Sequence, residues 1–296
     1  MRIGVVLPMG SHIGPPRSFA EVRAFARHAE AVDLDSLWVF DHVILRLPDQ
    51  PEAGTLEGWT TLALLGAATE RIGIGSLVLG LRFRNPALLA KMAVTLDEAS
   101  GGRLTLGVSA GWHQPEYDAF GWPNDHRLGR TEESMAILRG LLDGDRVMYT
   151  GHWERAHDAV LLPPPARRIP ILSSSRRGRM ARIVARYADA WNGAWMARPD
   201  DPDLVARVEE LHRACDDVGR DPAEIEPTAG VWVRYPDANE PSPTRGRGDS
   251  SGEPAAVAES LAAFAEGGYS QLMVWLGPMD QRGLDRLAES VALLRA

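Results

Sequence analysis

Short apolar runs alternate along the chain with longer segments in which apolar residues recur with helical spacing. The apolar runs have the length of buried strands and lie at 3–7, 36–40, 72–79, 104–109, 169–172, 188–191, 226–233 and 271–276. Helical spacing is found at 18–31, 59–69, 86–99, 131–142, 180–187, 203–218 and 254–266. Strands that alternate with helices form parallel sheets. Eight of them predict a closed TIM-type (β/α)8 barrel, built by residues 1–296 as a single domain.

Two segments interrupt this alternation. After the fourth strand, residues 112–170 form a longer passage that contains the helix at 131–142, with Thr131 as its expected cap, and a hairpin around 149–153. This passage predicts an insertion over the strand ends. Residues 237–252 are rich in Pro, Ser, Gly and Arg and carry no apolar anchors, which predicts a mobile loop after the seventh strand.

The composition narrows the classes of partner. The net charge of −8 argues against nucleic acid, because proteins that bind the phosphate backbone usually carry a basic face. The single cysteine, Cys215, cannot form an internal disulfide, which fits a reducing cytoplasm. The first apolar run is too short for a signal peptide, and no window of about 18 apolar residues predicts a membrane span. We therefore expect a globular cytoplasmic protein with neither nucleic acid nor membrane as a partner.

Two ionisable residues, Asp41 and His42, follow directly after the second predicted strand. In α/β barrels the active site lies at the carboxyl ends of the strands. A histidine there has a pKa near neutrality, and together with an acidic neighbour it suits proton transfer. The alternative is a structural histidine that is hydrogen-bonded inside a loop. The spacing alone leaves both interpretations open.

A second candidate site is the turn that leads from the fifth strand into a helix. It consists of Ser173, Ser174, Ser175 and Arg176, with further arginines just beyond. Backbone N–H groups at a helix start, hydroxyl groups and guanidinium groups together suit a phosphate. The alternative is an ordinary serine cap followed by solvated arginines. The chain has no Walker or dinucleotide-binding fingerprint that would supply another phosphate site.

Large aromatic side chains also fall at predicted strand ends. Trp112, Trp195 and Trp275 could line a pocket for a planar ring, although ordinary barrel packing explains them as well. The eight histidines include no pair with metal-ligand spacing within one helix, so no metal site is expected. There is also no Gly-x-Ser-x-Gly sequence of the kind that serine hydrolases use.

Several of these segments together resemble the bacterial luciferase-like flavin and deazaflavin oxidoreductases, which share a TIM-type barrel. The resemblance covers nearly the whole chain, and its most specific part is the Ser-Gly-Gly-Arg run at 100–103 with Gly111-Trp112 after the next strand. It further rests on 36–42, 68–76, 84–91 and 96–108, on Glu116, Tyr117, Phe120, Gly121, Arg127, Glu132 and Glu133, and on 188–192. Within this family, the chain looks most like the branch that depends on coenzyme F420.

The resemblance implies roles for individual residues. His42 would move a proton to or from the substrate oxygen, and Asp41 would orient His42 or contact the cofactor ring. Leu77 and Val78 match the place where many members hold a non-proline cis peptide bond behind that ring. The other implied cofactor contacts are Ser109, Gly111 and the turn from Ser173 to Arg176, where the family usually has more glycine. Trp112, Trp195 and the insertion would shape the substrate pocket.

The expected function is hydride transfer between F420 and a small organic substrate, with the protein as a homodimer. Two alternatives stay open at this point. One is an FMN-dependent monooxygenase that takes reduced flavin from a partner reductase and activates O2. The other is a degenerate barrel that binds a ligand without redox chemistry, which the changed serine and arginine turn at 173–177 suggests.

Overall fold

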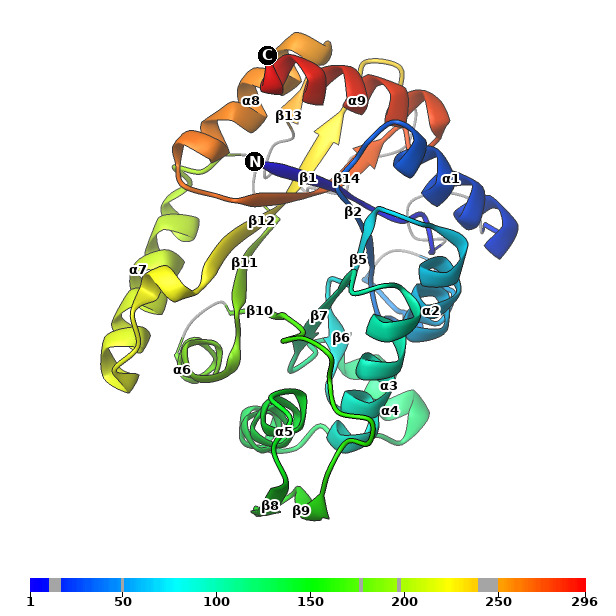
Figure 1. Cartoon of the computed structure of the whole chain (residues 1–296). Helices are drawn as coiled ribbons and strands as arrows, with labels where there is room; N and C mark the ends of the chain where they lie inside the picture. Colours follow the sequence, from blue (N-terminus) through cyan, green and yellow to red (C-terminus); the bar gives the residue numbers. More distant parts are fainter. Residues whose placement is uncertain (11–16, 49–50, 176–177, 196–197, 239–249) are drawn as a thin grey trace.

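The computed structural model describes residues 1–10, 17–48, 51–175, 178–195, 198–238 and 250–296. Eight parallel strands pair side by side, and β7 pairs in turn with β10, so that the sheet closes on itself (Figure 1). The predicted TIM-type barrel is therefore confirmed. In their order around the barrel the strands are β10 (Ile171–Ser174), β11 (Ala190–Trp195), β12 (Glu226–Arg234), β14 (Gln271–Gly277), β1 (Arg2–Val6), β2 (Ser36–Val39), β5 (Gly73–Ser76) and β7 (Leu104–Ser109).

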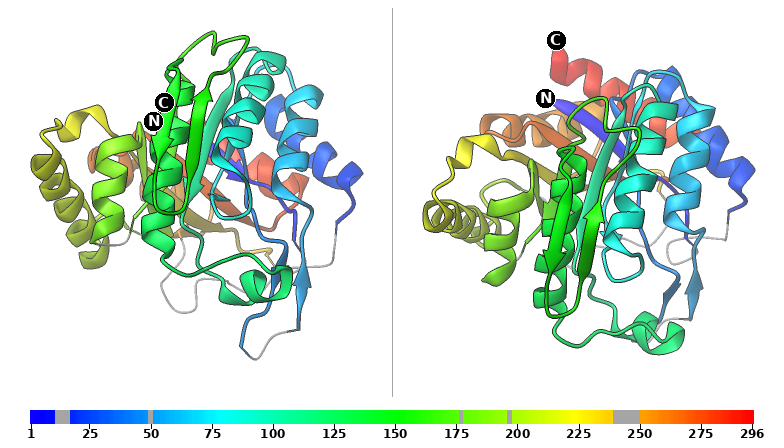
Figure 2. Two further views of the ribbon diagram at one scale, coloured as in Figure 1. Left: turned by 90° about the horizontal axis from the view of Figure 1, so that it is seen from below. Right: turned by 60° about the horizontal axis from the view of Figure 1, so that its bottom comes forward.

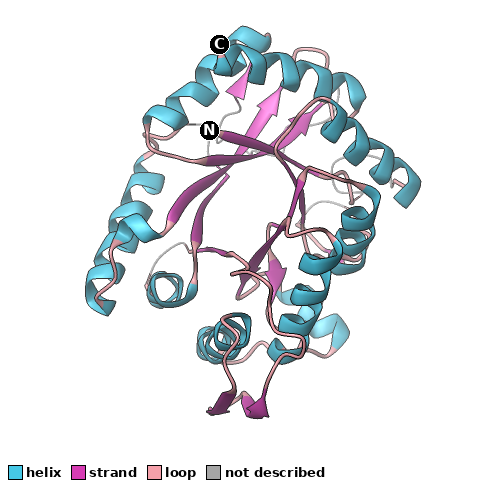
Figure 3. Cartoon of the chain, viewed as in Figure 1, coloured by secondary structure: helices cyan, strands magenta, loops and turns pink. Residues whose placement is uncertain are grey.

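Helices surround the barrel on its outside (Figure 3). They are α1 (Phe19–Ala31), α2 (Gly58–Ala68), α3 (Pro86–Ala99), α5 (Arg127–Leu142), α6 (Arg179–Tyr187), α7 (Pro202–Val218), α8 (Pro254–Glu266) and α9 (Gln281–Arg295). Helix α9 was not predicted, although its buried Leu284, Leu287 and Val291 have helical spacing. The prediction of Thr131 as a cap is wrong, because α5 begins one turn earlier and the Thr131 hydroxyl donates to the carbonyl of Arg127. None of the described helices combines the length and the apolarity that crossing a membrane requires.

Several smaller elements lie between the strands and helices of the barrel. The predicted hairpin in the insertion is confirmed as β8 (Val147–Thr150) and β9 (Arg155–Ala159). The insertion also contains α4 (Gln114–Phe120), which was not predicted and which projects from the same end of the barrel as β3 (Ile44–Leu45) and β4 (Ala53–Gly54) (Figure 2). A short 3-10 helix, η2 (Pro222–Glu224), precedes β12.

Two of the predicted boundaries change. The single strand expected at 72–79 divides into β5 and a short β6 (Leu79–Gly80), and the cis peptide bond that the resemblance implies joins Leu77 to Val78. Most of the predicted mobile loop, residues 239–249, lies outside the described residues. Its described end forms β13 (Ser250–Ser251), which pairs with the last residues of β12.

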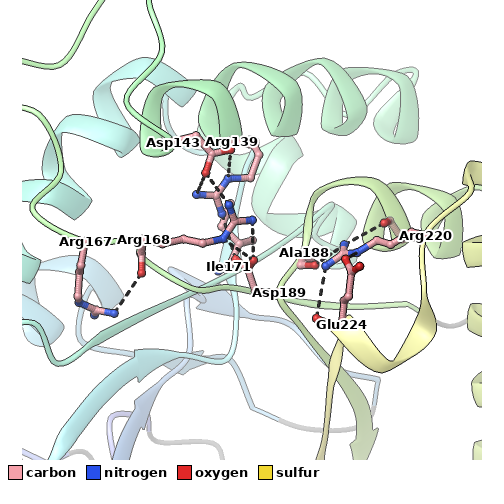
Figure 4. Close-up of polar contacts among 10 residues, drawn as sticks. Arg139, Asp143, Arg167, Arg168, Ile171, Ala188, Asp189, Arg220 and Glu224 are labelled. Carbon is pink, nitrogen blue, oxygen red and sulfur yellow. Dashed lines mark hydrogen bonds and ion pairs between the residues drawn. The ribbon is translucent and has the colours of Figure 1, made fainter.

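The end of the barrel opposite the strands' carboxyl ends is fastened by charged side chains (Figure 4). Asp189, just before β11, accepts a hydrogen bond from the backbone N–H of Ile171 at 2.8 Å and pairs with Arg139 of α5 at 3.0 Å. Arg168 joins the same carboxylate at 2.8 Å and also reaches Asp143. This network ties α5 to two strands at their amino ends.

The Ser-Gly-Gly-Arg run has a structural explanation. Gly101 and Gly102 adopt positive φ angles of 71° and 81°, which glycine accepts without steric cost. They turn the chain so that the Arg103 guanidinium donates five hydrogen bonds, which go to the backbone or side-chain oxygens of Gly66, Thr69, Ile72 and Ser100. Arg103 therefore closes the carboxyl end of α2 and the loop into β5.

Replacing Arg103 by Met is expected to lower the free energy of unfolding by roughly 2–3 kcal/mol, because several carbonyl groups lose a charged donor. Urea denaturation measures the change. Arg71→Met serves as the control, since Arg71 is exposed and lies 3.8 Å from Asp33. Equal stability of the two variants would show that the Arg103 bonds contribute little.

Candidate active site

Asp41 lies at the carboxyl end of β2, but its carboxylate is fully engaged in holding loops together. It pairs with Arg84 at 2.7 and 3.0 Å and accepts the backbone N–H of Gly80 at 2.9 Å. Arg84 also pairs with Glu57, which caps the start of α2. Burial disfavours the charge of Arg84, yet the two carboxylates outweigh it and raise the pKa of the guanidinium. Asp41 thus fixes three segments at the barrel mouth.

His42 is oriented by Glu116 and not by Asp41, which corrects one of the two roles expected for Asp41. The Nδ1 atom of His42 lies 3.0 Å from Oε2 of Glu116, a residue of α4 that is only 1% exposed. An ionised carboxylate only accepts hydrogen bonds, so the neutral imidazole carries its proton on Nδ1. Its Nε2 lone pair has no partner among the described residues, and the His42 side chain is 20% exposed.

The segment after His42 is fastened to the insertion by the same carboxylate. Oε1 of Glu116 accepts the backbone N–H groups of Val43 at 2.6 Å and Ile44 at 3.3 Å. His113 adds a third bond, because its Nε2 accepts the N–H of Arg46 at 3.0 Å. Burial lowers the pKa of His113, which keeps this ring neutral and able to accept. The backbone that follows His42 is therefore held in place by three hydrogen bonds.

Gly111 marks the point where the chain leaves β7. Its φ of 72° favours glycine, and the Tyr117 hydroxyl occupies the space that a side chain would need. Tyr117 donates to the carbonyl of Ala110 at 3.3 Å, and burial raises the pKa of the phenol to about 12. The hydroxyl is therefore a fixed neutral donor. This contact sets the direction in which Trp112 and α4 leave the barrel.

The serine run at the end of β10 differs from its prediction. The Ser173 hydroxyl is fully buried and donates to the carbonyl of Val108 at 2.7 Å. The Ser175 hydroxyl is buried as well and accepts the Trp191 indole N–H at 3.0 Å. Arg176 lies outside the described residues. Only Ser174 stays partly exposed, so three hydroxyl groups do not converge on one ligand.

The two tryptophans that the resemblance assigns to the substrate pocket both lie at the mouth. Trp112 is 59% exposed, and its ring meets the His42 ring edge-on with centroids 5.5 Å apart. Trp195 is partly exposed at the end of β11 and contacts Trp232 and Trp275. Trp112 thus covers the proton-transfer candidate, whereas Trp195 belongs to an aromatic group on another part of the rim.

The amino-acid sequence matches a known protein family. The sequence model of the luciferase-like monooxygenase family matches residues 1–240. The chain belongs to this family. A solved luciferase-like barrel, an F420-dependent secondary alcohol dehydrogenase in complex with an F420–acetone adduct, matches 100% of this chain and 99% of its own with a TM-score of 0.81. Its sequence identity is 19%, so this likeness concerns the fold.

Two curated relatives are closer in sequence. The F420-dependent glucose-6-phosphate dehydrogenase of Microbacterium testaceum is 32% identical over 222 residues, which are 73% of this chain and 64% of that protein. The phthiodiolone/phenolphthiodiolone dimycocerosates ketoreductase of a Mycobacterium species (strain JLS) is 31% identical over 254 residues, or 78% of this chain and 65% of that protein. Each alignment therefore spans slightly less than two thirds of the relative's length.

In this luciferase-like chain, the remaining half of the mouth is lined by small or apolar residues. Strands β5, β7 and β10 are neighbours there. The residues at their carboxyl ends that stay partly exposed are Leu77, Val78, Ser109, Gly111 and Ser174. They offer a surface that a flat ring system can approach closely. Within the described part of the chain, no group of three or more His, Cys, Asp or Glu side chains is placed to hold a metal ion.

Proposed function

We propose that this luciferase-like protein is an F420-dependent oxidoreductase that acts on a small organic substrate, with His42 as the proton-transfer residue. The observation that carries the proposal is the His42–Glu116 pair at the mouth of the barrel, where one ring nitrogen is fixed and the other is unpartnered among the described residues. The name of one relative, the F420-dependent glucose-6-phosphate dehydrogenase, supports the choice of cofactor.

The small and apolar half of the mouth fits such a cofactor. Leu77 and Val78 would lie behind the deazaflavin ring, Ser109 and Gly111 beside it, and Ser174 with nearby backbone N–H groups would hold its phosphate. Each of these residues keeps part of its surface exposed. When bound, F420 supplies a carbon that accepts or donates a hydride.

His42 handles the proton that accompanies the hydride. When the substrate is an alcohol, the Nε2 lone pair takes the proton of the hydroxyl as the C–H bond gives up its hydride. In the opposite direction, protonated His42 returns this proton to the oxygen of the carbonyl compound. Glu116 stabilises the positive charge of the ring by its contact with Nδ1, and Trp112 shields the pair from water.

Turnover with matched alcohol and ketone pairs tests the proposal. We expect secondary alcohols to reduce F420 and the corresponding ketones to reoxidise it, with no requirement for O2. If F420 stays unchanged while reduced FMN supports substrate-dependent consumption of O2, the protein is a flavin monooxygenase instead. If neither cofactor binds, the proposal fails in favour of a binding protein without redox chemistry.

The variant Ser174→Asp tests the phosphate contact. A carboxylate at this position would repel a bound phosphate, so we expect the affinity for F420 to fall about tenfold at low salt and less at high salt. Fluorescence titration with F420 measures the change. Ser174→Asn is the matched neutral control, and Ser175 is unsuitable because its hydroxyl is buried against Trp191. Unchanged affinity in the Asp variant would remove the phosphate from this turn.

A further inference from the structure

We propose that the substrate binds against an aromatic arc on the barrel rim and is therefore an uncharged, largely apolar secondary alcohol or ketone. The arc consists of Phe40, Trp195, Trp232 and Trp275. Phe40 follows β2, Trp195 ends β11, and Trp232 and Trp275 lie near the carboxyl ends of β12 and β14. The inference rests on the proposed function, since it names the class of substrate for that same site. The arc lies on the part of the mouth that the proposed cofactor contacts leave free.

The four rings form one continuous surface. Phe40 stacks on Trp275 with centroids 5.6 Å apart, and Trp275 meets Trp232 at 4.7 Å. Trp195 extends the row, with its centroid 5.1 Å from that of Trp232 and 5.5 Å from that of Trp275. Rings in such tilted and stacked arrangements hold one another in place. The arc is therefore a preformed wall.

The backbone places this wall at the mouth. Trp232 and Trp275 are direct partners in the register of β12 and β14, so their side chains share one face of the sheet. Trp195 crosses this face over Gly230, where an added Cβ would lie 2.7 Å from the indole ring. Only glycine leaves room for the ring there.

The arc ends beside the reacting group. The Phe40 ring centroid lies 6.3 Å from that of His42, two residues further along the chain. Phe40 and Trp275 are buried, whereas Trp195 and Trp232 keep part of their surface exposed. A ligand that covers these exposed ring faces can direct its oxygen towards His42. The mouth thus offers an apolar surface for the body of the substrate and, at one end of that surface, His42 for its oxygen.

The charged side chains described near these strand ends already have partners. Arg234, at the end of β12, donates to the carbonyl of Ala238 at 2.8 Å. Arg207 of α7 donates to the carbonyl of Gly193 in β11 at 3.0 Å and pairs with Asp203. An anionic substrate would lose hydration against the rings, which is costly. This argues against a sugar phosphate.

Binding of matched probes in the absence of cofactor tests the inference. We expect cyclohexanone to bind, as measured by calorimetry or by saturation transfer to its proton signals, and glucose 6-phosphate to show no binding. Trp195→Ala should weaken cyclohexanone binding about tenfold, since an apolar contact face is lost. Leu293→Ala, on the exposed surface of α9, is the control and should leave the affinity unchanged. Trp232→Leu gives the same test if Trp195→Ala does not fold.

The outcomes separate this inference from the proposed function. Preferential binding of glucose 6-phosphate, or cyclohexanone binding that neither arc variant weakens, would overturn the aromatic arc as the substrate site. Such a result would leave F420 binding untouched. Conversely, if the protein does not bind F420, cyclohexanone should still bind to the protein without cofactor.

Discussion

The variant His42→Asn is expected to lower kcat for F420-dependent turnover by about 10²–10⁴-fold, which is the usual contribution of a positioned acid or base. Asparagine keeps a polar side chain of similar reach but cannot take up a proton near neutral pH. The affinity for F420 should change little, because His42 bonds to Glu116 and not to the residues assigned to the cofactor. Steady-state rates and a cofactor titration on the same preparation measure both quantities.

The control for this variant is His157→Asn, because His157 lies exposed on β9, away from the strand ends. It should retain the activity of the parent protein. The pH dependence of the rate adds a second criterion, because loss of the proton-transfer group should change its shape. Full activity in His42→Asn, with an unchanged profile, would assign the proton step to another residue.

The variant Glu116→Gln is expected to lower kcat by about 10²-fold or more, although it removes no group that touches the substrate. The amide oxygen of glutamine can still accept the backbone N–H groups of Val43 and Ile44, so the loop stays fastened. Its NH2 group then faces Nδ1 of His42 and forces that atom to accept. The ring proton moves to Nε2, which is the wrong tautomer for taking a proton from an alcohol.

The matched control is Glu133→Gln. Glu133 also accepts three backbone N–H groups, from His152, Trp153 and Glu154, but it contacts no proton-transfer candidate. Proton NMR of the imidazole groups distinguishes the two tautomers of His42 directly. If Glu116→Gln kept both the rate and the His42 tautomer of the parent, then Glu116 would serve only to hold the loop.

The barrel could be predicted from the sequence because its strands are buried on both sides and therefore read as plain apolar runs. The exceptions have local causes. The third apolar run is divided into two strands at Leu77–Val78, and this division cannot be predicted from hydrophobicity because both residues are apolar. The last helix, α9, alternates its buried leucines with many charged residues and was not recognised. The start of α5 was misplaced since neither its first residue nor its capping histidine forms a side-chain cap.

The site was predicted only in part, for a similar reason. A strand end can be located from the sequence, which pointed to His42, but its partner Glu116 lies 74 residues away in the insertion. Likewise, Arg84, which pairs with Asp41, lies 43 residues further along the chain. The prediction that three serine hydroxyl groups bind one phosphate failed because adjacent residues of an extended chain point to opposite sides. Ser173 and Ser175 are therefore buried on one side of the chain, while Ser174 on the other side stays partly exposed.

Titration of the purified protein with F420 and with FMN, under the same conditions, tests whether this protein is an F420-dependent enzyme. We expect F420 to quench the protein fluorescence until the signal saturates, and Ser174→Asp to weaken this binding. FMN should neither saturate the signal nor displace F420. Tight binding of FMN together with no detectable binding of F420 would show that the protein is not an F420-dependent oxidoreductase.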